Sequence, residues 1–103
     1  MSAVAVFRAL GDPNRLAMVK RLSSGDNYTI NTVSQGLDIT RQGARKHLQI
    51  LVDSDLVRLK SEGRDTQVLL NKKKLDEGRA YIAELERQWD ARLEALKRVV
   101  EGE

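Results

Sequence analysis

A run of basic and amide side chains near the middle of the chain has the chemistry to recognise nucleic acid. If residues 41–53 are helical, their polar side chains fall within an arc of about 140°. These side chains are Arg41, Gln42, Arg45, Lys46, Gln49 and Asp53. Arginine pairs bidentately with guanine and glutamine with adenine in the major groove, while lysine reaches guanine or phosphate. The alternative interpretation of this polar stripe is an ordinary solvated helix face. The segments before and after the stripe distinguish the two interpretations.

The segment before this stripe predicts a helix-turn-helix. Thr40 is a good N-cap for a helix that runs to about Ser54 and buries a leucine stripe. Upstream, Asn31 can cap a brief helix that ends near Gly36. We expect a tight turn over residues 37–39, with Asp38 in the left-handed conformation that Asp tolerates. Two helices joined by a three-residue turn over residues 31–54 form a helix-turn-helix.

The segment after the stripe predicts a β-hairpin. Residues 56–60 and 66–70 alternate in character and are separated by a five-residue turn, residues 61–65. We expect Val57 and Leu59 to face inward and Arg58 and Lys60 to face outward. Such a hairpin directly after a recognition helix is a wing, so residues 56–70 complete a mainly α fold with a β-hairpin, the winged helix-turn-helix.

The tip of this hairpin is a second candidate contact. Gly63 allows a close turn, and Arg64 beside it can enter a minor groove or clamp a phosphate. A glycine and a charge at a hairpin tip also occur for solubility alone. The functional interpretation of Arg64 therefore depends on the helix-turn-helix beside it.

Two short helices and a possible edge strand precede the motif. Apolar spacing predicts a helix over residues 3–10, and Asp12 with Pro13 predicts the N-cap and first position of a second helix that runs towards Gly25. Residues 28–30 are strand-prone but few, which favours a short extended link or an edge strand.

The C-terminal segment, residues 75–100, predicts one long helix with a heptad-like seam. The seam residues are separated by three, four, four, three and four positions, and they are Ile82, Leu85, Trp89, Leu93, Leu96 and Val100. The seam could close the domain's own core against the first helix or meet the same surface of a second copy. A helix of about 25 residues spans nearly 40 Å, so we expect part of the seam to need a partner.

The 103 residues fit a single domain, residues 1–103, whose charge is unevenly distributed. Residues 1–38 carry four basic and three acidic side chains (+1), residues 39–74 nine and four (+5), and residues 75–103 five and eight (−3). The central block suits phosphates, which repel an acidic tail. Three consecutive lysines at residues 72–74 are equally well explained by phosphate contact or by a solvated helix start.

Composition excludes several other functions. There is no cysteine, and a single histidine, His47, cannot supply a zinc or copper site. No Gly-rich phosphate loop or paired nucleophile and base indicates an enzyme, and no cofactor is expected. Carboxylates at residues 86, 90 and 94 are better explained as a solvated face than as a metal site. No signal peptide or membrane span is indicated, which leaves the cytoplasm as the expected location.

Nearly the whole chain resembles the ArsR-type winged helix-turn-helix repressors. The resemblance rests on residues 9–15 (ALGDPNR), 39–48 (ITRQGARKHL) and 62–64 (EGR), and the tail from Trp89 to Leu96 resembles a subgroup with a long, tryptophan-containing final helix. The cysteine pair of metal-sensing members has no counterpart at residues 31–35, so thiolate metal sensing is not implied. Arg45 stands where many relatives have a small polar residue, so no operator sequence is implied.

The resemblance implies a homodimer on double-stranded DNA. Its recognition helices would enter successive major grooves, and its wings would reach the flanking minor grooves. By this resemblance, Thr40 and His47 join the predicted DNA contacts, although His47 is at least as easily explained by packing. The first and last helices would form the dimer interface, with the residues Val6, Phe7, Leu10, Ile82, Leu85, Trp89, Leu93 and Leu96.

We expect such a dimer to repress transcription from an inverted-repeat operator whose half-sites lie about one helical turn apart. The sequence is also compatible with two other functions. One is a protein-interaction module that docks through the acidic last helix, since fold alone does not fix function. The other is a sensor of a carboxylate-ligated metal or of a small molecule, and the sequence identifies no effector.

Overall fold

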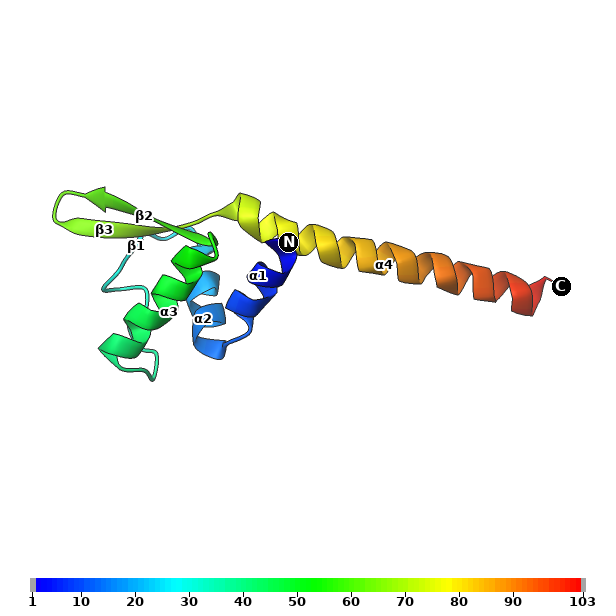
Figure 1. The fold of residues 1–103 in the computed structure, drawn as a ribbon, viewed down its shortest axis with the longest axis horizontal. Helices are drawn as coiled ribbons and strands as arrows, with labels where there is room; N and C mark the ends of the chain where they lie inside the picture. The colour runs from blue at the N-terminus through cyan, green and yellow to red at the C-terminus, as the bar shows by residue number, and fades with distance from the viewer. Residues whose placement is uncertain (1, 103) are drawn as a thin grey trace.

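The computed structural model describes residues 2–102, which form four helices and three strands (Figure 1). The elements are α1 (Ser2–Leu10), α2 (Pro13–Leu22), β1 (Tyr28–Thr29), α3 (Arg41–Asp53), β2 (Val57–Glu62), β3 (Asp65–Leu70) and α4 (Lys72–Glu101). Helices α1–α3 and the sheet make a compact body, and α4 extends from it as a long rod. The winged helix-turn-helix fold is confirmed.

The second helix begins as its sequence predicts. Asp12 is the N-cap of α2, and its Oδ1 accepts hydrogen bonds from the backbone N–H groups of Asn14 (2.8 Å) and Arg15 (3.2 Å). Pro13 occupies the first helical position, where it removes an N–H that would have no partner within the helix. The turn between α1 and α2 is therefore fixed locally.

The predicted short helix at residues 31–36 was wrong, because these residues form consecutive turns. Asn31 does not cap them. Instead, Thr32 Oγ1 accepts from the backbone N–H of Thr29 (2.8 Å), and Thr29 Oγ1 accepts from that of Thr32 (3.3 Å). Residues 32–34 are Thr, Val and Ser, which are all weak helix formers. The first half of the helix-turn-helix is thus an open loop held by local hydrogen bonds.

The left-handed residue of this segment is Gly36, with φ +83°, and the prediction of Asp38 was wrong. Glycine has no Cβ and adopts this conformation without strain, so the chain reverses two residues earlier than predicted.

The strands form a three-stranded antiparallel sheet in the order β1-β3-β2. Tyr28 pairs with Val68, which confirms that residues 28 and 29 form an edge strand. The strands of the wing are longer and its turn tighter than predicted: Glu62 pairs with Asp65, so only Gly63 (φ +63°) and Arg64 connect β2 and β3. A positive-φ glycine at the first turn position matches the right-handed twist of a hairpin.

One side chain of the predicted inner face of the wing is less covered than the others. Val57 is buried as predicted, but Leu59 is 43% exposed. Leu59 is paired with the buried Val68 and therefore lies on the predicted inner face, but it stands on β2, an edge strand of the sheet, and is only partly covered there. Strand alternation predicts which side chains share a face, but not how far along the strand that face is covered.

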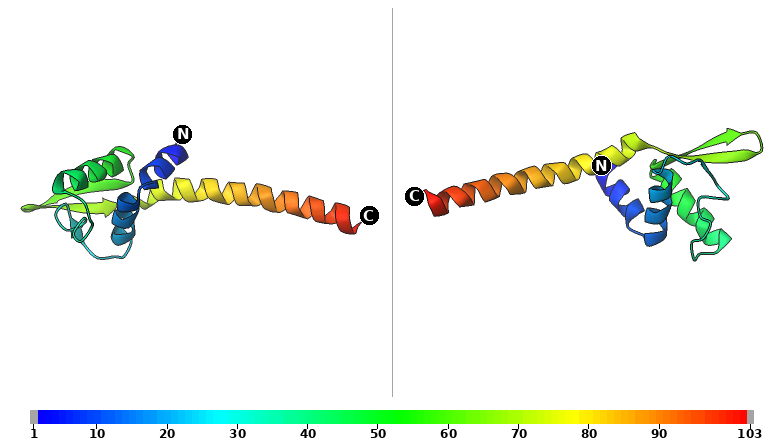
Figure 2. Two further views of the ribbon diagram at one scale, coloured as in Figure 1. Left: turned by 90° about the horizontal axis from the view of Figure 1, so that it is seen from below. Right: turned by 180° about the vertical axis from the view of Figure 1, so that it is seen from behind.

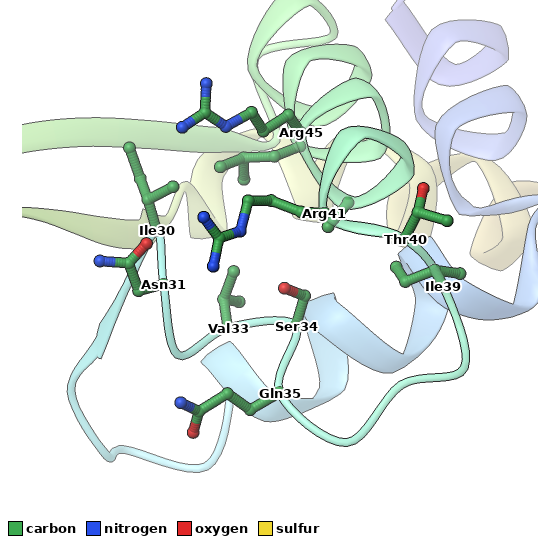
Figure 3. Close-up of a pocket in the computed structure, with 11 residues that line it drawn as sticks. Ile30, Asn31, Val33, Ser34, Gln35, Ile39, Thr40, Arg41 and Arg45 are labelled. Atoms are coloured by element: carbon green, nitrogen blue, oxygen red, sulfur yellow. The ribbon is translucent and has the colours of Figure 1, made fainter.

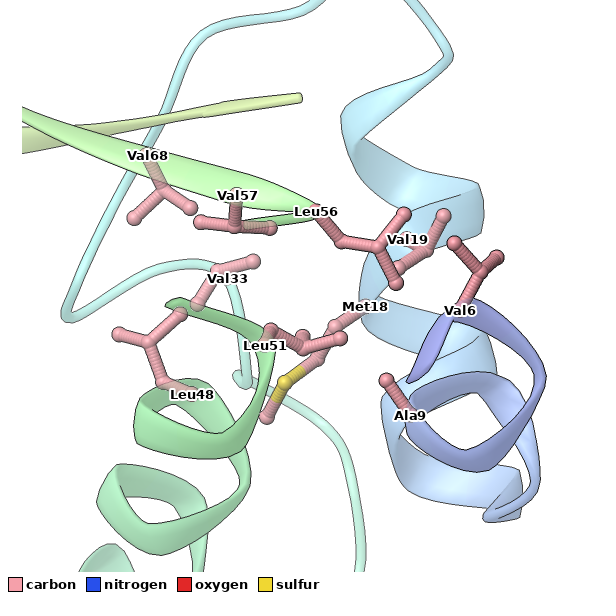
Figure 4. Packing of buried hydrophobic residues seen from close by; sticks show 10 residues of the cluster. All are labelled: Val6, Ala9, Met18, Val19, Val33, Leu48, Leu51, Leu56, Val57 and Val68. Atoms are coloured by element: carbon pink, nitrogen blue, oxygen red, sulfur yellow. The ribbon is translucent and has the colours of Figure 1, made fainter. Parts of the chain in front are cut away.

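The core lies where α1, α2, α3 and the base of the wing meet (Figure 4). Its centre is formed by Met18, Leu51 and Leu56, each fully buried, and Val33 anchors the turn segment against them. Every element of the body except the wing tip thus contributes to one apolar cluster.

Helix α4 contacts this body only near its N-terminal end. Gly78 is buried, and a Cβ there would lie 3.0 Å from Val6 Cγ1, so the glycine allows α1 and α4 to approach closely. Phe7 packs edge-to-face on Tyr81, with ring centroids 6.0 Å apart. Beyond this contact α4 projects freely in every view (Figure 2). The radius of gyration is 18.6 Å, against about 13 Å for a compact chain of this length.

Candidate nucleic-acid interface

Helix α3 presents one face to the core and the opposite face to solvent. Thr40 caps the helix, because its Oγ1 accepts a hydrogen bond from the backbone N–H of Gly43 at 2.9 Å. Leu48 and Leu51 are buried. Five of the predicted DNA contacts within α3 are exposed, and they are Arg41, Gln42, Arg45, Lys46 and Gln49.

The cations on this face are free of carboxylates. Within residues 2–102, Arg41, Arg45 and Lys46 take part in no ion pair, and neither does Arg64 at the wing tip. A cation without a protein partner keeps its full charge available for a phosphate or a guanine edge. This face therefore has the electrostatics of a surface that meets an anion.

Gln49 differs from the other members of the stripe. Its Nε2 donates a hydrogen bond to Asp53 Oδ1 at 2.8 Å, so its amide is held along the helix and stands beside a carboxylate. It also lies two turns from the N-terminus of α3, the end that usually contacts bases. The structure therefore favours Arg41 and Gln42 over Gln49 as base contacts.

A hollow of about 280 Å³ lies between α3 and the turn segment (Figure 3). Arg41 and Arg45 line it from α3, and Asn31, Ser34 and Gln35 line it from the turns. Figure 3 shows Arg41 reaching from the helix towards Asn31. The three turn residues bring hydrogen-bonding groups to the same site, and sequence reasoning missed them because a predicted helix at 31–36 gave no reason to single them out.

The wing tip lies at the same end of the molecule as the N-terminus of α3, far from the C-terminus of α4 (Figure 1). Arg64 is exposed at this tip. Arg58, lower on the wing, is instead paired with Asp55 at 3.6 Å. The free cations of α3 and of the wing tip therefore gather at one end of the body.

His47 faces inward, towards the junction of α1 and α2. Its Nδ1 lies 3.0 Å from Arg15 Nη1, and its Nε2 lies 3.8 Å from Asp12 Oδ1. Only 20% of the side chain is exposed. The structure thus favours the packing interpretation of His47 over DNA contact. Arg15, which makes the contact, was not predicted, since nothing in the sequence shows that α2 and α3 meet there.

The same cluster shifts the titration of Asp12. Partial desolvation raises the pKa of the Asp12 carboxyl, but this is outweighed by the backbone N–H groups of Arg15 and Asn14 and by the positive charge of Arg15. The net effect lowers the pKa of Asp12 below its ordinary value.

The seam of α4 is exposed along its whole length. Its six side chains are between 45% and 83% exposed. Phe7 and Leu10 of α1 border an apolar groove of about 410 Å³ that continues into this seam at Ile82. Val6 is different: it is 1% exposed and packs on Gly78 inside the protomer, so it reaches this surface only as the floor of the groove.

Two other features, a metal site and a membrane-spanning helix, are not found in the part of the chain that the structure describes. Residues 2–102 bring together no three His, Asp or Glu side chains that could hold a metal ion. Their helices also include none that is both long and apolar enough to cross a membrane.

Comparisons with known proteins agree with this geometry. Residues 10–60 match the family model of a helix-turn-helix domain. The chain is 34% identical over 77 residues to YuzN, an uncharacterized helix-turn-helix-type transcriptional regulator of Bacillus subtilis (strain 168), and the match covers 69% of this chain and 84% of the relative.

Solved structures of ArsR-type regulators share this fold. An ArsR-like transcriptional regulator from Rhodococcus sp. RHA1 superposes with a TM-score of 0.82 at 25% identity, covering 99% of this chain and 95% of that one. The homodimeric winged helix-turn-helix DNA-binding domain of a possible ArsR-family regulator from Mycobacterium bovis superposes with a TM-score of 0.62 at 20% identity, covering 91% and 83%. The chain belongs to the ArsR family of winged helix-turn-helix, DNA-binding transcriptional regulators.

Proposed function

We propose that this regulator is a repressor that binds an inverted-repeat operator as a homodimer. The proposal rests on two surfaces of the protomer that have no partner within it. One is formed by the cations of α3 and the wing tip, which pair with no carboxylate, and the other is the exposed apolar seam of α4. The first suits DNA, and the second suits another copy of the same seam.

The proposed DNA contacts follow from position. Arg41, Gln42, Arg45 and Lys46 line the exposed face of α3 and read bases or hold phosphates in the major groove. Thr40 contributes at the helix N-terminus, where a hydroxyl beside free backbone N–H groups suits a phosphate. Arg64 reaches the flanking minor groove or its phosphates. Gln49 is a secondary contact, and His47 leaves the set because its side chain is only 20% exposed and its Nδ1 contacts Arg15 inside the protomer.

The proposed dimer covers the surface that the protomer leaves open. Phe7 and Leu10 of α1 join the α4 seam residues Ile82, Leu85, Trp89, Leu93 and Leu96 in a continuous apolar strip. Soluble monomers rarely expose such a strip. The homodimeric state of the Mycobacterium bovis domain gives a precedent for this partner. Two-fold symmetry of the protein then predicts an inverted repeat with half-sites about one helical turn apart.

A binding experiment tests the proposal. Sequences bound by the purified protein are selected from random DNA, and the motif is tested by gel shift against the region upstream of the regulator's own operon. We expect an inverted repeat whose affinity falls steeply with salt, because phosphate contacts release counterions. A motif without internal symmetry, or no sequence-dependent shift at micromolar protein, would contradict the proposal.

Repression needs its own measurement. A reporter gene placed behind the selected operator should be less active when the regulator is co-expressed, because a dimer that covers the promoter blocks access to it. A reporter with a scrambled operator is the control. Increased expression from the intact operator would show an activator instead.

A further inference from the structure

One side chain, Arg15, connects three helices. Arg15 lies in the first turn of α2, and its Nε donates a hydrogen bond to the carbonyl oxygen of Ala9 at 2.6 Å. Its Nη2 donates to the carbonyl oxygen of Arg8 at 3.4 Å, and its Nη1 lies 3.0 Å from His47 Nδ1 on α3. A guanidinium presents its donors in a fixed planar fork, so these bonds set the direction of α3 relative to the end of α1.

His47 completes the connection from the other side. Because a guanidinium only donates, Nδ1 of His47 accepts from Arg15, and the proton of a neutral ring is then on Nε2. That nitrogen faces Asp12 Oδ1 at 3.8 Å, and the same oxygen caps α2. The contact of Nδ1 with Arg15 therefore holds the imidazole at the junction between α1 and α2, with Asp12 beside it, and the cluster is defined as Asp12, Arg15 and His47.

The cluster lies between α1 and α3, two helices with different proposed partners. Helix α1 borders the apolar groove at Phe7 and Leu10, and α3 carries the free cations. The core contacts of α3 are made by the apolar side chains Ala44, Leu48, Leu51 and Val52, and apolar contacts carry little directional information. Hydrogen bonds from a planar group do depend on direction. The cluster is thus a directional link between the dimer-facing helix and the DNA-facing helix.

We infer that Arg15 and His47 are positioning residues that fix the recognition helix relative to α1, and so set the spacing of the two recognition helices across the dimer. The inference rests on the proposed function, since only a dimer on DNA gives this spacing a meaning. Contacts that must be held within about 0.5 Å lose affinity when their supporting residues are removed. Loss of the cluster should therefore weaken specific binding, while the charge of the exposed cations still supports binding to any DNA.

The test compares Arg15→Gln, Arg15→Lys and His47→Gln with the wild type. Lys20→Gln is the matched control, because it removes an exposed cation of the same helix that is in no ion pair within residues 2–102. Each protein is titrated against the selected operator, against operators whose half-sites are moved by one or two base pairs, and against an unrelated duplex of equal length. Thermal unfolding and light scattering verify that each variant is folded and dimeric.

For all three cluster variants we expect operator affinity to fall by about 10- to 100-fold while affinity for the unrelated duplex changes by less than about threefold. The preference for one half-site spacing should flatten in parallel. Lys20→Gln should keep the wild-type ratio between the two DNAs. Lysine cannot span three acceptors in a plane, so Arg15→Lys should behave like Arg15→Gln.

Several results would overturn the inference. Equal losses on both DNAs would make Arg15 or His47 a phosphate contact, and recovery by Arg15→Lys would mean that only charge matters. If Arg15→Gln does not fold, His47→Gln decides, since it leaves the bonds from Arg15 to α1 intact. Cluster variants that bind both DNAs with wild-type affinity would overturn this inference but leave the proposed function standing. A wild type without operator preference would overturn the proposed function as well.

Discussion

Helices α3 and α4 are both amphipathic, but each leaves a different face unsatisfied. In α3 the apolar side chains Leu48 and Leu51 are buried, while the cations of the opposite face stand free. In α4 the apolar seam is exposed, with Trp89 at 55%, while four cations pair with carboxylates on their own helix. These four are Lys72, Lys74, Arg79 and Arg87.

The difference shows what each helix is built to meet. Ion pairs three or four residues apart neutralise an exposed helix surface at little cost, and α4 uses them where α3 does not. An apolar seam left open suits another apolar surface, and unpaired cations suit an anion. The apolar seam of α4 therefore suits a protein partner, and the cationic face of α3 suits DNA.

We expect the largest effect from substitutions that prevent the apolar seam of α4 from binding a second copy of the chain. Trp89→Gln combined with Leu93→Gln should convert the dimer to monomers and reduce operator affinity by more than about 100-fold, because the second half-site is no longer bound at high effective concentration. Light scattering and gel shift measure the two effects. Ala91→Gln is the matched control on the opposite side of the helix, and equal effects from it would contradict the assignment of the seam.

Removing a free cation from α3 should have the next largest effect. Arg41→Ala or Arg45→Ala should cost about 1–3 kcal/mol on the operator and relax base preference at one position of each half-site. Binding to operator variants with single base changes measures this. Gln49→Ala is the control, because its amide is already held by Asp53; a loss as large as that of Arg41→Ala would reverse our ranking of these residues.

A smaller effect is expected at the wing. Arg64→Ala should weaken binding to all sequences by a similar factor and reduce the slope of log affinity against log salt by about 1. Titrations at several salt concentrations give the slope. Arg58→Ala, which removes a wing cation paired with Asp55, should leave the slope nearly unchanged. A change in base preference with Arg64→Ala would indicate direct reading of bases.

The smallest effect concerns acid stability of the body. The pKa of Asp12 is lowered in the folded state, so its ionised form stabilises the fold above its ordinary range, and this contribution is lost as the pH falls through the lowered value. Asp12→Asn keeps a good cap but does not titrate. Urea unfolding should show a small loss near neutral pH and a flatter decline in acid than the wild type. Parallel declines would remove Asp12 from the acid response.

Local patterns were sufficient for much of this fold. Asp12 with Pro13 predicted the start of α2, Thr40 predicted the start of α3, and both caps are present. Caps and amphipathic spacing depend on residues within one or two turns, so the sequence contains all the information they need. The exposed cations of α3 follow from the same spacing.

Contacts between distant segments required the tertiary structure. How far Leu59 is covered depends on the position of β2 at the edge of the sheet, and the meeting of Arg15 with His47 joins residues 32 positions apart. The turns at residues 31–36 likewise replace a short predicted helix, because isolated short helices are marginal and packing decides between them and loops.

The sequence by itself determined the starts of α2 and α3, the wing, the cationic face and the apolar seam of α4, because each is a periodic or local property of the chain. Only the tertiary structure decided that this seam lies bare, that Val6 is withdrawn into the core, and that His47 is turned away from the DNA-facing surface. Those outcomes depend on which elements pack together, and packing is a property of the whole fold.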